Sequence, residues 1–418
     1  MTRTSYCGID FGTSNSAIAA PHNNNIRLLP VEGDSATLPS AIFYAASRTP
    51  TYGRQAQKLF FEGEEGRFMR SLKRILGTSL MAQGTVVNGK IKKFEDIIGD
   101  FIRHLKTGAE KSGGQTLDSV VMGRPVHFID HDPGADGRAE DELAAIARAQ
   151  GFKDVLFQFE PIAAAFAHEQ NVAKEKLALV VDIGGGTSDF TVIRVCRDYA
   201  AKDDRSGDIL GNAGVRVGGN DFDKGFSLAC FMPAFGSKST YGGKRLHVPA
   251  SPFHELSEWS KVNFLYTPRN RKMLDDILAE SHSPKKFGRF VNAVEREIGH
   301  RILATVEEAK ITLTAATAHD ADLNFVESDF HLPLTREAFD ASAEVSVEKI
   351  GQAMDECLAG ANVTADKIEI IILTGGPTET PLLKNLVRTR FPAAEISEEN
   401  KLSSVALGLG FDSQRKFG

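Results

Sequence analysis

The feature that most constrains the fold is a glycine-centred segment that occurs twice. Residues 8–18 read GIDFGTSNSAI, and residues 181–193 read VDIGGGTSDFTVI. In both copies an aspartate follows an apolar run, glycine comes next, and a Thr-Ser pair precedes a second run rich in apolar residues. This order is typical of a strand, a tight turn and a returning strand, which form a β-hairpin. Two such units far apart in one chain predict a duplicated domain with two lobes.

The rest of the chain alternates between short apolar runs and amphipathic stretches. Residues 119–123 and 368–374 are short apolar runs next to glycine, which favours buried central strands. Apolar side chains recur at helical spacing in residues 94–105, in residues 139–150, and along one stripe from residue 294 to 313. Strands that alternate with helices predict α/β lobes.

Composition excludes several classes of function. Hydrophobic residues make up 42% of the 418 residues, and 49 Lys+Arg against 55 Asp+Glu give a net charge of −6. This balance does not favour general nucleic-acid binding, which needs clustered cations. There is no signal-peptide pattern and no transmembrane run, and the four cysteines are scattered. We therefore expect a cytoplasmic protein with neither nucleic acid nor membrane as a partner.

Both glycine turns have the chemistry of phosphate-binding loops. Glycine lets successive backbone N–H groups converge on one concavity, and the Thr-Ser pair adds hydroxyl donors. The turns are flanked by Asp10, Asp182 and Asp189, whose carboxylates suit Mg²⁺ held through water molecules. The first turn alone also fits an ordinary glycine hairpin. Two such hairpins facing each other would hold a polyphosphate and its metal ion between two lobes.

The two turns resemble the phosphate signatures of the actin/hexokinase/heat-shock ATPase superfamily, and in particular those of the ATPase domain of DnaK-type heat-shock chaperones. Four further segments resemble that domain's motifs in the same order: SLKRILG at 71–77, EPIAAA at 160–165, GGNDFD at 218–223 and TGG at 374–376. The polar loop at 198–212 and the basic segment at 236–289 are similar to those of the YegD-type subgroup.

The resemblance implies a duplicated, ribonuclease-H-like α/β fold with two lobes around a nucleotide cleft. The first lobe would have its inner subdomain at 1–38 and 118–176 and its outer subdomain at 39–117. The second would have its inner subdomain at 177–225 and 315–418 and its outer subdomain at 226–314. The sequence ends at residue 418 without an apolar linker, so we expect no C-terminal peptide-binding domain.

The resemblance also implies roles for single residues in binding ATP or ADP with Mg²⁺. The catalytic residues would be Lys73, Glu160, Asp182 and Thr187, and the metal would be organised by Asp10, Asp182 and Asp189. The phosphates would contact Gly12, Thr13, Ser14, Gly184, Gly185, Gly186, Thr187, Gly218 and Gly219. Lys73 also fits a surface lysine, and Glu160 also fits an acid placed to favour a helix N-terminus.

The adenosine half departs from the family's pattern. Its contacts would come from one helical face and a glycine loop, namely Glu307, Lys310, Thr314, Gly375 and Gly376. Ile311 and Glu379 replace the two arginines that stack on adenine in the family. Because one stacked arginine contributes roughly 0.5–2 kcal/mol, we expect weaker nucleotide binding or a different base preference.

Three functions fit these observations. The first is a slow, Mg²⁺-dependent ATPase that acts as a chaperone-like switch, with a protein partner or client on its outer subdomains. The second is a small-molecule kinase that uses Glu160 as its base. The third is a nucleotide-binding or protein-interaction scaffold that does not hydrolyse ATP. Retention of Lys73, Glu160 and the three aspartates favours the first.

Two other clusters have competing interpretations. His127, Asp130, His131 and Asp132 resemble metal ligands but lack regular ligand spacing, so we expect a solvated loop. The segment at 236–289 carries ten Lys/Arg and five Asp/Glu. It fits either the solvated face of an accessory subdomain or a docking surface for an anionic partner.

Overall fold

The computed structural model describes residues 5–23, 25–46, 49–202, 204–397 and 403–418. The chain divides into two compact units. The first comprises the described residues of 1–218, 349–379 and 383–418, and the second comprises residues 219–348 and 380–382. The boundaries of the four predicted subdomains stay predictions.

The first sheet is built around the strand that leads into the first glycine turn. This strand runs antiparallel to the strand after the turn and parallel to the strand on its other side. In spatial order the strands are β11 (Asp154–Phe159), β10 (Ser119–Arg124), β1 (Tyr6–Phe11), β2 (Asn15–His22) and β3 (Asn25–Leu28), and β4 (Thr37–Pro39) also pairs with β2. The predicted hairpin and the predicted strand at 119–123 are both confirmed.

The second sheet repeats this arrangement. Its strands in spatial order are β14 (Ile209–Val215), β13 (Ser188–Val195), β12 (Lys176–Ile183), β19 (Ile370–Thr374) and β20 (Glu395–Ser397). β12 is antiparallel to β13, and β13 is antiparallel to β14, whereas β19 is parallel to β12 and β20 is parallel to β19. When β4 is left out and the strands are numbered along the chain, the first sheet read from β3 and the second sheet read from β14 both follow the order 3-2-1-4-5. The duplication predicted from the two hairpins is therefore confirmed.

The central strands of the first sheet are buried on both faces. Val120 and Met122 of β10 belong to the core that includes α2 (Phe94–Gly113) and α3 (Pro133–Ala149). Val121 faces the other way, into a core with α4 (Glu160–His168) and α12 (Ser404–Phe417). Because successive side chains of a strand point to opposite faces, a continuous apolar run is what such a strand requires.

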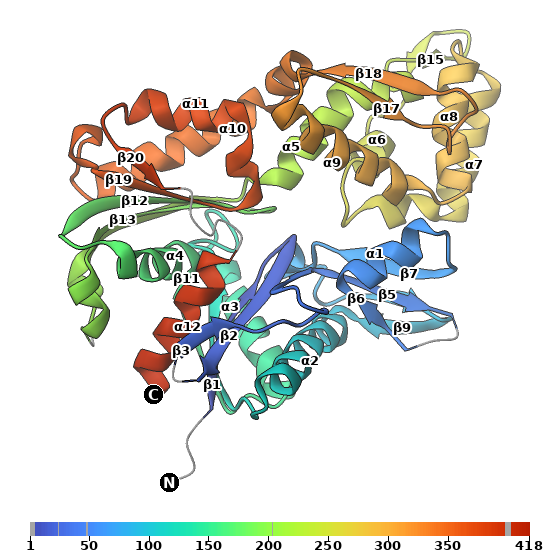
Figure 1. The fold of residues 1–418 in the computed structure, drawn as a ribbon. Helices are drawn as coiled ribbons and strands as arrows, with labels where there is room; N and C mark the ends of the chain where they lie inside the picture. The colour runs from blue at the N-terminus through green and yellow to red at the C-terminus, as the bar shows by residue number, and fades with distance from the viewer. Residues whose placement is uncertain (1–4, 24, 47–48, 203, 398–402) are drawn as a thin grey trace. The chain divides into compact units, whose positions relative to one another are not determined.

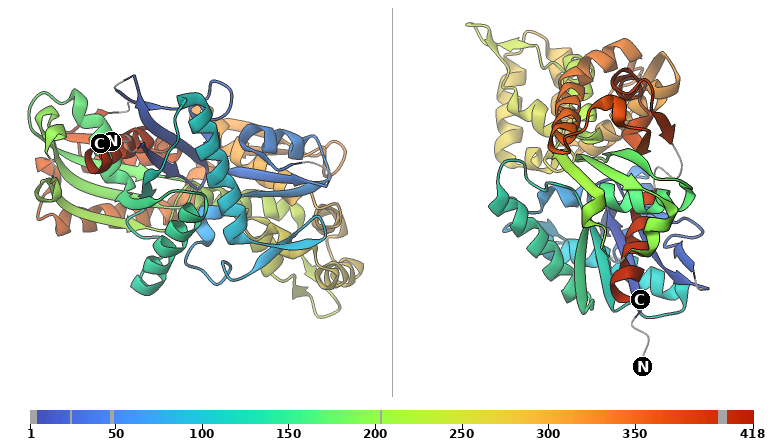
Figure 2. Two further views of the ribbon diagram at one scale, coloured as in Figure 1. Left: turned by 90° about the horizontal axis from the view of Figure 1, so that it is seen from below. Right: turned by 90° about the vertical axis from the view of Figure 1, so that its left-hand side faces the viewer.

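The helix that follows the last strand of each sheet packs on the other sheet. α4 follows β11 of the first sheet but packs on β12, β13 and β19 of the second. α12 follows β20 but packs on β1, β2 and β10 of the first sheet, and against α4 (Figure 1 and Figure 2). A Cβ atom on Gly408 would overlap the backbone of Ala163, so only glycine permits this approach. The exchanged helices join both sheets in one core.

The segment at 41–93 forms a small part of the first unit outside its two large sheets. It contains a three-stranded sheet, a hairpin and one short helix: β5 (Ala41–Ala45), β6 (Thr51–Tyr52), β7 (Gly66–Arg70), α1 (Gly53–Phe61), β8 (Gly84–Val87) and β9 (Lys90–Lys93). Between β7 and β8 lies a 3₁₀ turn, Leu72–Ile75, which carries Lys73.

The second unit is mostly helical and has an aromatic core. Phe226 packs edge-on against Phe231 and Phe339, with ring centroids 5.6 and 5.3 Å apart. Its elements are α5 (Gly219–Phe226), β15 (Thr240–Tyr241), β16 (Leu246–His247), α6 (Ser251–Leu256), α7 (Pro268–Ala279), α8 (Pro284–Glu295), α9 (Gly299–Ala315), β17 (Ala318–Asp322) and β18 (His331–Thr335). α10 (Arg336–Gly360) continues the chain into the first unit, where a 3₁₀ turn and α11 (Pro381–Arg390) follow β19.

Two expectations about these segments are wrong. The apolar stripe at 294–313 is not one helix, because α8 ends at Glu295, Glu297 adopts a φ of +54°, and α9 begins at Gly299. The polar segment at 198–212 is not all loop, because its last residues belong to β14 (Ile209–Val215), which pairs with β13. Arg205 is buried in it and donates to both oxygens of the Glu169 carboxylate, at 2.8 and 2.6 Å. This ion pair fixes the loop to the end of α4.

Candidate functional site

The two glycine turns meet within the first unit. A Cβ atom placed on Gly185 would overlap the hydroxyl of Ser14, and one on Gly186 would lie 2.9 Å from Oγ1 of Thr13. Gly218 approaches the second turn from another side, because its Cβ would lie 2.6 Å from the carbonyl oxygen of Gly184. The two hairpins therefore face each other, and the backbone at these glycines has no room for side chains.

Three aspartates lie beside the turns. Asp10 and Asp182 occupy the same place in the two sheets, one residue before the end of β1 and of β12. Asp189 stands opposite Asp182 in the β12–β13 register, and both are buried. The repeated fold thus delivers three carboxylates to one region.

A buried ion pair accompanies the aspartates. Nζ of Lys73 donates to Oε1 of Glu160, and only 7% and 8% of the two residues are exposed. Lys73 comes from the 3₁₀ turn after Ser71, whose φ of +60° turns the chain sharply inward. Glu160 is the first residue of α4. Lys73 is therefore not a surface lysine, whereas Glu160 is both an ion-pair partner and an N-terminal helix acid.

The cluster contains more carboxyl groups than cations, so a further cation would stabilise it. Burial and the Glu160 charge, opposed by Lys73, together raise the pKa of Asp10 to about 7. Burial and Glu160 raise the pKa of Asp189 to about 8, against the lowering effect of the Val126 N–H group. The pKa of Asp182 is raised well above its usual range for the same reasons. Four carboxyl groups share Lys73, which cannot neutralise them all.

One atom of the cluster bears directly on metal binding. Oδ2 of Asp189 is buried and has no hydrogen-bond partner in the described part of the chain. Nowhere among the described residues do three His, Cys, Asp or Glu side chains converge closely enough to ligate one metal ion directly. Mg²⁺ usually keeps several of its waters, so the aspartates fit Mg²⁺ held through water molecules.

The predicted adenosine residues belong to different units. Gly375 and Gly376 follow β19 in the first unit, and Gly375 has a φ of +86° beside Ile183. The second unit contains Glu307, Lys310 and Thr314 on α9, and also Gly219, a predicted phosphate contact, at the start of α5. Nζ of Lys310 lies 2.8 Å from Oδ1 of Asp223 in a buried ion pair. The adenosine contacts stay a prediction.

In the His-Asp cluster at 127–132, two of the aspartates accept hydrogen bonds that stabilise the local fold. The carboxylate of Asp132 accepts a hydrogen bond of 2.9 Å from Ala135 N–H and so caps α3. Oδ2 of Asp130 accepts one of 2.8 Å from the N–H of Arg216.

Sequence reasoning did not identify Val126, whose N–H donates to Asp189, or Asp223 as the partner of Lys310. Only Asp223 had a signal, as the last residue of the GGNDFD motif.

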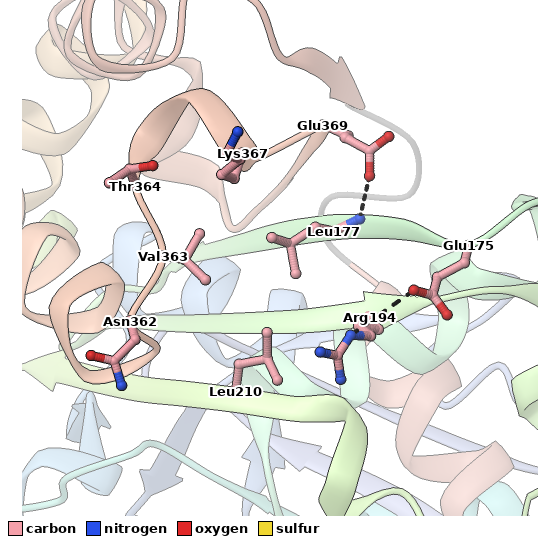
Figure 3. A pocket seen from close by; sticks show the side chains of 9 residues that line it. All are labelled: Glu175, Leu177, Arg194, Leu210, Asn362, Val363, Thr364, Lys367 and Glu369. Carbon is pink, nitrogen blue, oxygen red and sulfur yellow. Dashed lines mark hydrogen bonds and ion pairs between the residues drawn. The ribbon is translucent and has the colours of Figure 1, made fainter.

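An open pocket of about 460 Å³ lies elsewhere on the second sheet (Figure 3). Leu177, Leu210 and Val363 point into it, and Glu175 and Arg194 lie at one side. Leu177 is near the start of β12, whereas Asp182 is near its end. This pocket is therefore separate from the aspartate cluster.

Comparison with known proteins identifies relatives over nearly the whole chain. A family model described as "Hsp70 protein" matches residues 6–240 and 278–414. Chaperone protein dnaK1 of Prochlorococcus marinus is 25% identical over 96% of this chain and 55% of its own length. Chaperone protein DnaK of Thermosipho melanesiensis is 25% identical, with 96% and 57% covered. The chain spans a little over half the length of these curated relatives. No helix in the described ranges is long and apolar enough to cross a membrane.

Proposed function

Because the chain belongs to the Hsp70 family, with its actin- and hexokinase-like α/β fold, we propose that it is a Mg²⁺-dependent nucleotide switch that binds ATP and ADP and hydrolyses ATP slowly. The observation that supports this best is the contact between the two glycine turns beside the buried Lys73–Glu160 pair. Such an arrangement combines backbone N–H groups that can bind phosphate with a charged side chain that is already held in position.

The glycine turns would bind the phosphates. The N–H groups of residues 12–14, 185 and 186 and the hydroxyls of Thr13, Ser14 and Thr187 would supply donors without adding charge. The N–H of Gly184 instead closes the turn, by donating to the carbonyl of Thr187 at 2.9 Å. Gly218 keeps the second turn free of side-chain bulk from its own side. Mg²⁺, when bound, would supply positive charge for the phosphate oxygens, and Asp10, Asp182 and Asp189 would hold its waters.

Lys73 and Glu160 would act on the terminal phosphate. Burial lowers the pKa of Lys73, but Glu160 and Asp10 outweigh that effect and keep it raised, so the ammonium stays charged. A fixed positive charge in a dry site stabilises the negative charge that develops on the phosphoryl oxygens. The carboxylate of Glu160 would accept a hydrogen bond from the attacking water and orient it.

The kinase alternative has less support from this geometry. A kinase would need Glu160 to face a substrate hydroxyl, yet Glu160 is engaged with Lys73. Breaking a buried ion pair costs about 3–5 kcal/mol, so the pair favours a water held beside it over a reoriented carboxylate. Phosphate transfer to a panel of metabolite alcohols tests this alternative.

Calorimetric titration with ATP, ADP and GTP in Mg²⁺, followed by single-turnover hydrolysis, tests the proposal. Lys73→Ala is expected to bind ATP but to hydrolyse it about a hundredfold more slowly or worse. Lys106→Ala is the matched control, because Lys106 forms a 2.7 Å ion pair with Glu110 on α2. That control should retain full turnover.

Two results would contradict the proposal. No binding of any nucleotide by folded protein would favour a scaffold that has lost its ligand. Equal loss of turnover in both lysine variants would show that Lys73 acts only through stability. The replacement of the stacking arginines by Ile311 and Glu379 also leads us to propose weakened binding, which an ADP dissociation constant in the nanomolar range would contradict.

A further inference from the structure

An exposed basic region lies in the second unit, where the β15–β16 hairpin meets the loop before α8 (Figure 1). The N–H of His282 donates to the carbonyl of Thr240 at 2.8 Å, and the N–H of Gly242 donates to the carbonyl of Glu280 at 3.1 Å. These bonds fix the hairpin against residues 280–282. The lysines at the start of α8 therefore follow directly on the segment that is hydrogen-bonded to the hairpin.

Five cationic side chains are exposed on these neighbouring segments. We define the basic patch as Lys238, Lys244, Arg245, Lys285 and Lys286. Lys285 lies 3.3 Å from Glu327, whereas no ion pair is formed by the other four within the described residues. By contrast, Lys261 and Arg271 in the same segment pair with Glu258 and Glu297. Most of the positive charge of the patch is therefore not neutralised by an ion pair.

Few carboxylates face this charge. Glu280 lies under the hairpin turn, since a Cβ on Gly242 would be 3.0 Å from its Oε2. Glu327 is shared between Lys285 and Arg289. Two carboxylates against five patch cations leave a local excess of positive charge, which attracts an anionic partner.

The patch also offers an apolar contact and a strand edge. Leu246 of β16 is 53% exposed and directly follows Arg245 of the patch. In the described part of the chain, β16 pairs only with β15, so its other edge is open. An exposed edge and a single apolar side chain suit an extended peptide better than a nucleic-acid backbone.

Part of the basic patch lies outside the match to the Hsp70 family model, whereas Lys238, Lys285 and Lys286 lie inside it. Residues 241–277 fall outside the match to the Hsp70 family model, and they contain Lys244, Arg245 and Leu246. The proposed catalytic residues all lie in the first unit. Nucleotide chemistry therefore does not account for the exposed charge.

We propose that the basic patch is a docking surface for an acidic polypeptide segment, with Leu246 contacting an apolar residue of the partner. The chain as a whole carries a net charge of −6, which disfavours long polyanions such as nucleic acids and leaves a short acidic peptide as the better fit. The surface is independent of ATP hydrolysis, so either proposal can fail alone.

The test uses a fluorescently labelled glutamate-rich peptide with one central leucine, and measures its anisotropy with the full chain. The double variant Lys244→Glu/Arg245→Glu is expected to weaken binding about tenfold or more, which corresponds to about 1.4 kcal/mol. Arg269→Glu/Lys272→Glu makes the same change in net charge at the exposed start of α7. Arg269 and Lys272 are about 16 and 12 Å along the helix from the loop at 280, at 1.5 Å per residue. This control should change the affinity less than about twofold.

Further measurements keep the proposal falsifiable. Leu246→Ser should weaken binding of the leucine-containing peptide but not of an all-glutamate peptide, and high salt should weaken both. Equal loss in the two charge variants would overturn the proposal, because net charge alone would then explain binding. Absence of binding to the unaltered chain at low salt, or tighter binding of a single-stranded oligonucleotide of equal charge, would also overturn it.

Discussion

The backbone N–H of Val126 donates a hydrogen bond of 2.7 Å to Oδ1 of Asp189. Val126 follows β10 of the first sheet, and Asp189 lies on β13 of the second. The bond therefore joins the two sheets beside the glycine turns. The other oxygen of the same carboxylate is buried and unpartnered among the described residues. Asp189 thus has both a structural contact and an atom available to a ligand.

Asp189→Asn separates these two roles. The asparagine Oδ1 still accepts a hydrogen bond from Val126, so we expect the fold to be retained. The lost negative charge should weaken Mg²⁺–ATP binding about tenfold or more, while binding of metal-free ATP changes less. Calorimetry with and without Mg²⁺ measures both. Unchanged Mg²⁺-dependent affinity would remove Asp189 from the proposed metal site.

The stability of the nucleotide-free protein should fall as the pH rises from about 4 to about 8. Burial raises the pKa of Asp10 from 3.8 to about 7 and that of Asp189 from 3.8 to about 8. Over this range the folded protein holds protons that the unfolded chain has released, so stability is lost as these carboxyls ionise. Urea unfolding at a series of pH values measures the slope.

A double variant and a ligand control this measurement. Asp10→Asn/Asp189→Asn should unfold with a flatter pH dependence, because neither position can ionise. Saturating Mg²⁺–ADP should recover stability mainly at the alkaline end, since a bound cation favours the ionised carboxylates. An identical slope in the double variant and the unaltered protein would show that other groups control the pH dependence.

The parts of the fold that were predictable carry local signals. Gly12 and Gly184–Gly186 punctuate apolar runs, so both hairpins could be identified from the sequence. The break between α8 and α9 could not, because the apolar spacing continues through it. It arises where Gly299 packs close to Leu256 and Val262, which are distant in sequence. The exchange of α4 and α12 likewise depends on contacts such as Gly408 with Ala163.

The candidate site was predictable in its residue types but not in its partners. The resemblance to a known family identified Lys73 and Glu160, but their ion pair depends on a 3₁₀ turn and a helix start that no local pattern joins. The donor to Asp189 is a backbone N–H group, and any residue other than proline at 126 provides one. Sequence alone therefore cannot single out that contact.

The ion pair between Lys310 and Asp223 allows a stability test that involves only residues of the second unit. Its ammonium lies 2.8 Å from Asp223, and both residues are buried. Asp223→Ala removes that carboxylate and should lower the free energy of unfolding by about 3–5 kcal/mol. The double variant Asp223→Leu/Lys310→Met should regain most of this loss, because it removes both buried charges. Chemical denaturation compares them, and a double variant as unstable as Asp223→Ala would mean that lost packing, not an unpaired charge, causes the effect.

Gly218→Ala tests whether the close approach of Gly218 holds the second glycine turn in place. A Cβ at 218 would lie 2.6 Å from the carbonyl oxygen of Gly184 and 2.7 Å from the nitrogen of Gly186. These are backbone atoms, which cannot rotate away, so overpacking should cost about 1–3 kcal/mol and displace the second turn. Gly207→Ala is the control, because its Cβ would meet no atom within 4 Å and Gly207 lies outside the glycine turns. Thermal unfolding and ATP titration should show losses for Gly218→Ala that exceed those of the control, and equal losses would show that the close approach at Gly218 is not what holds the turn in place.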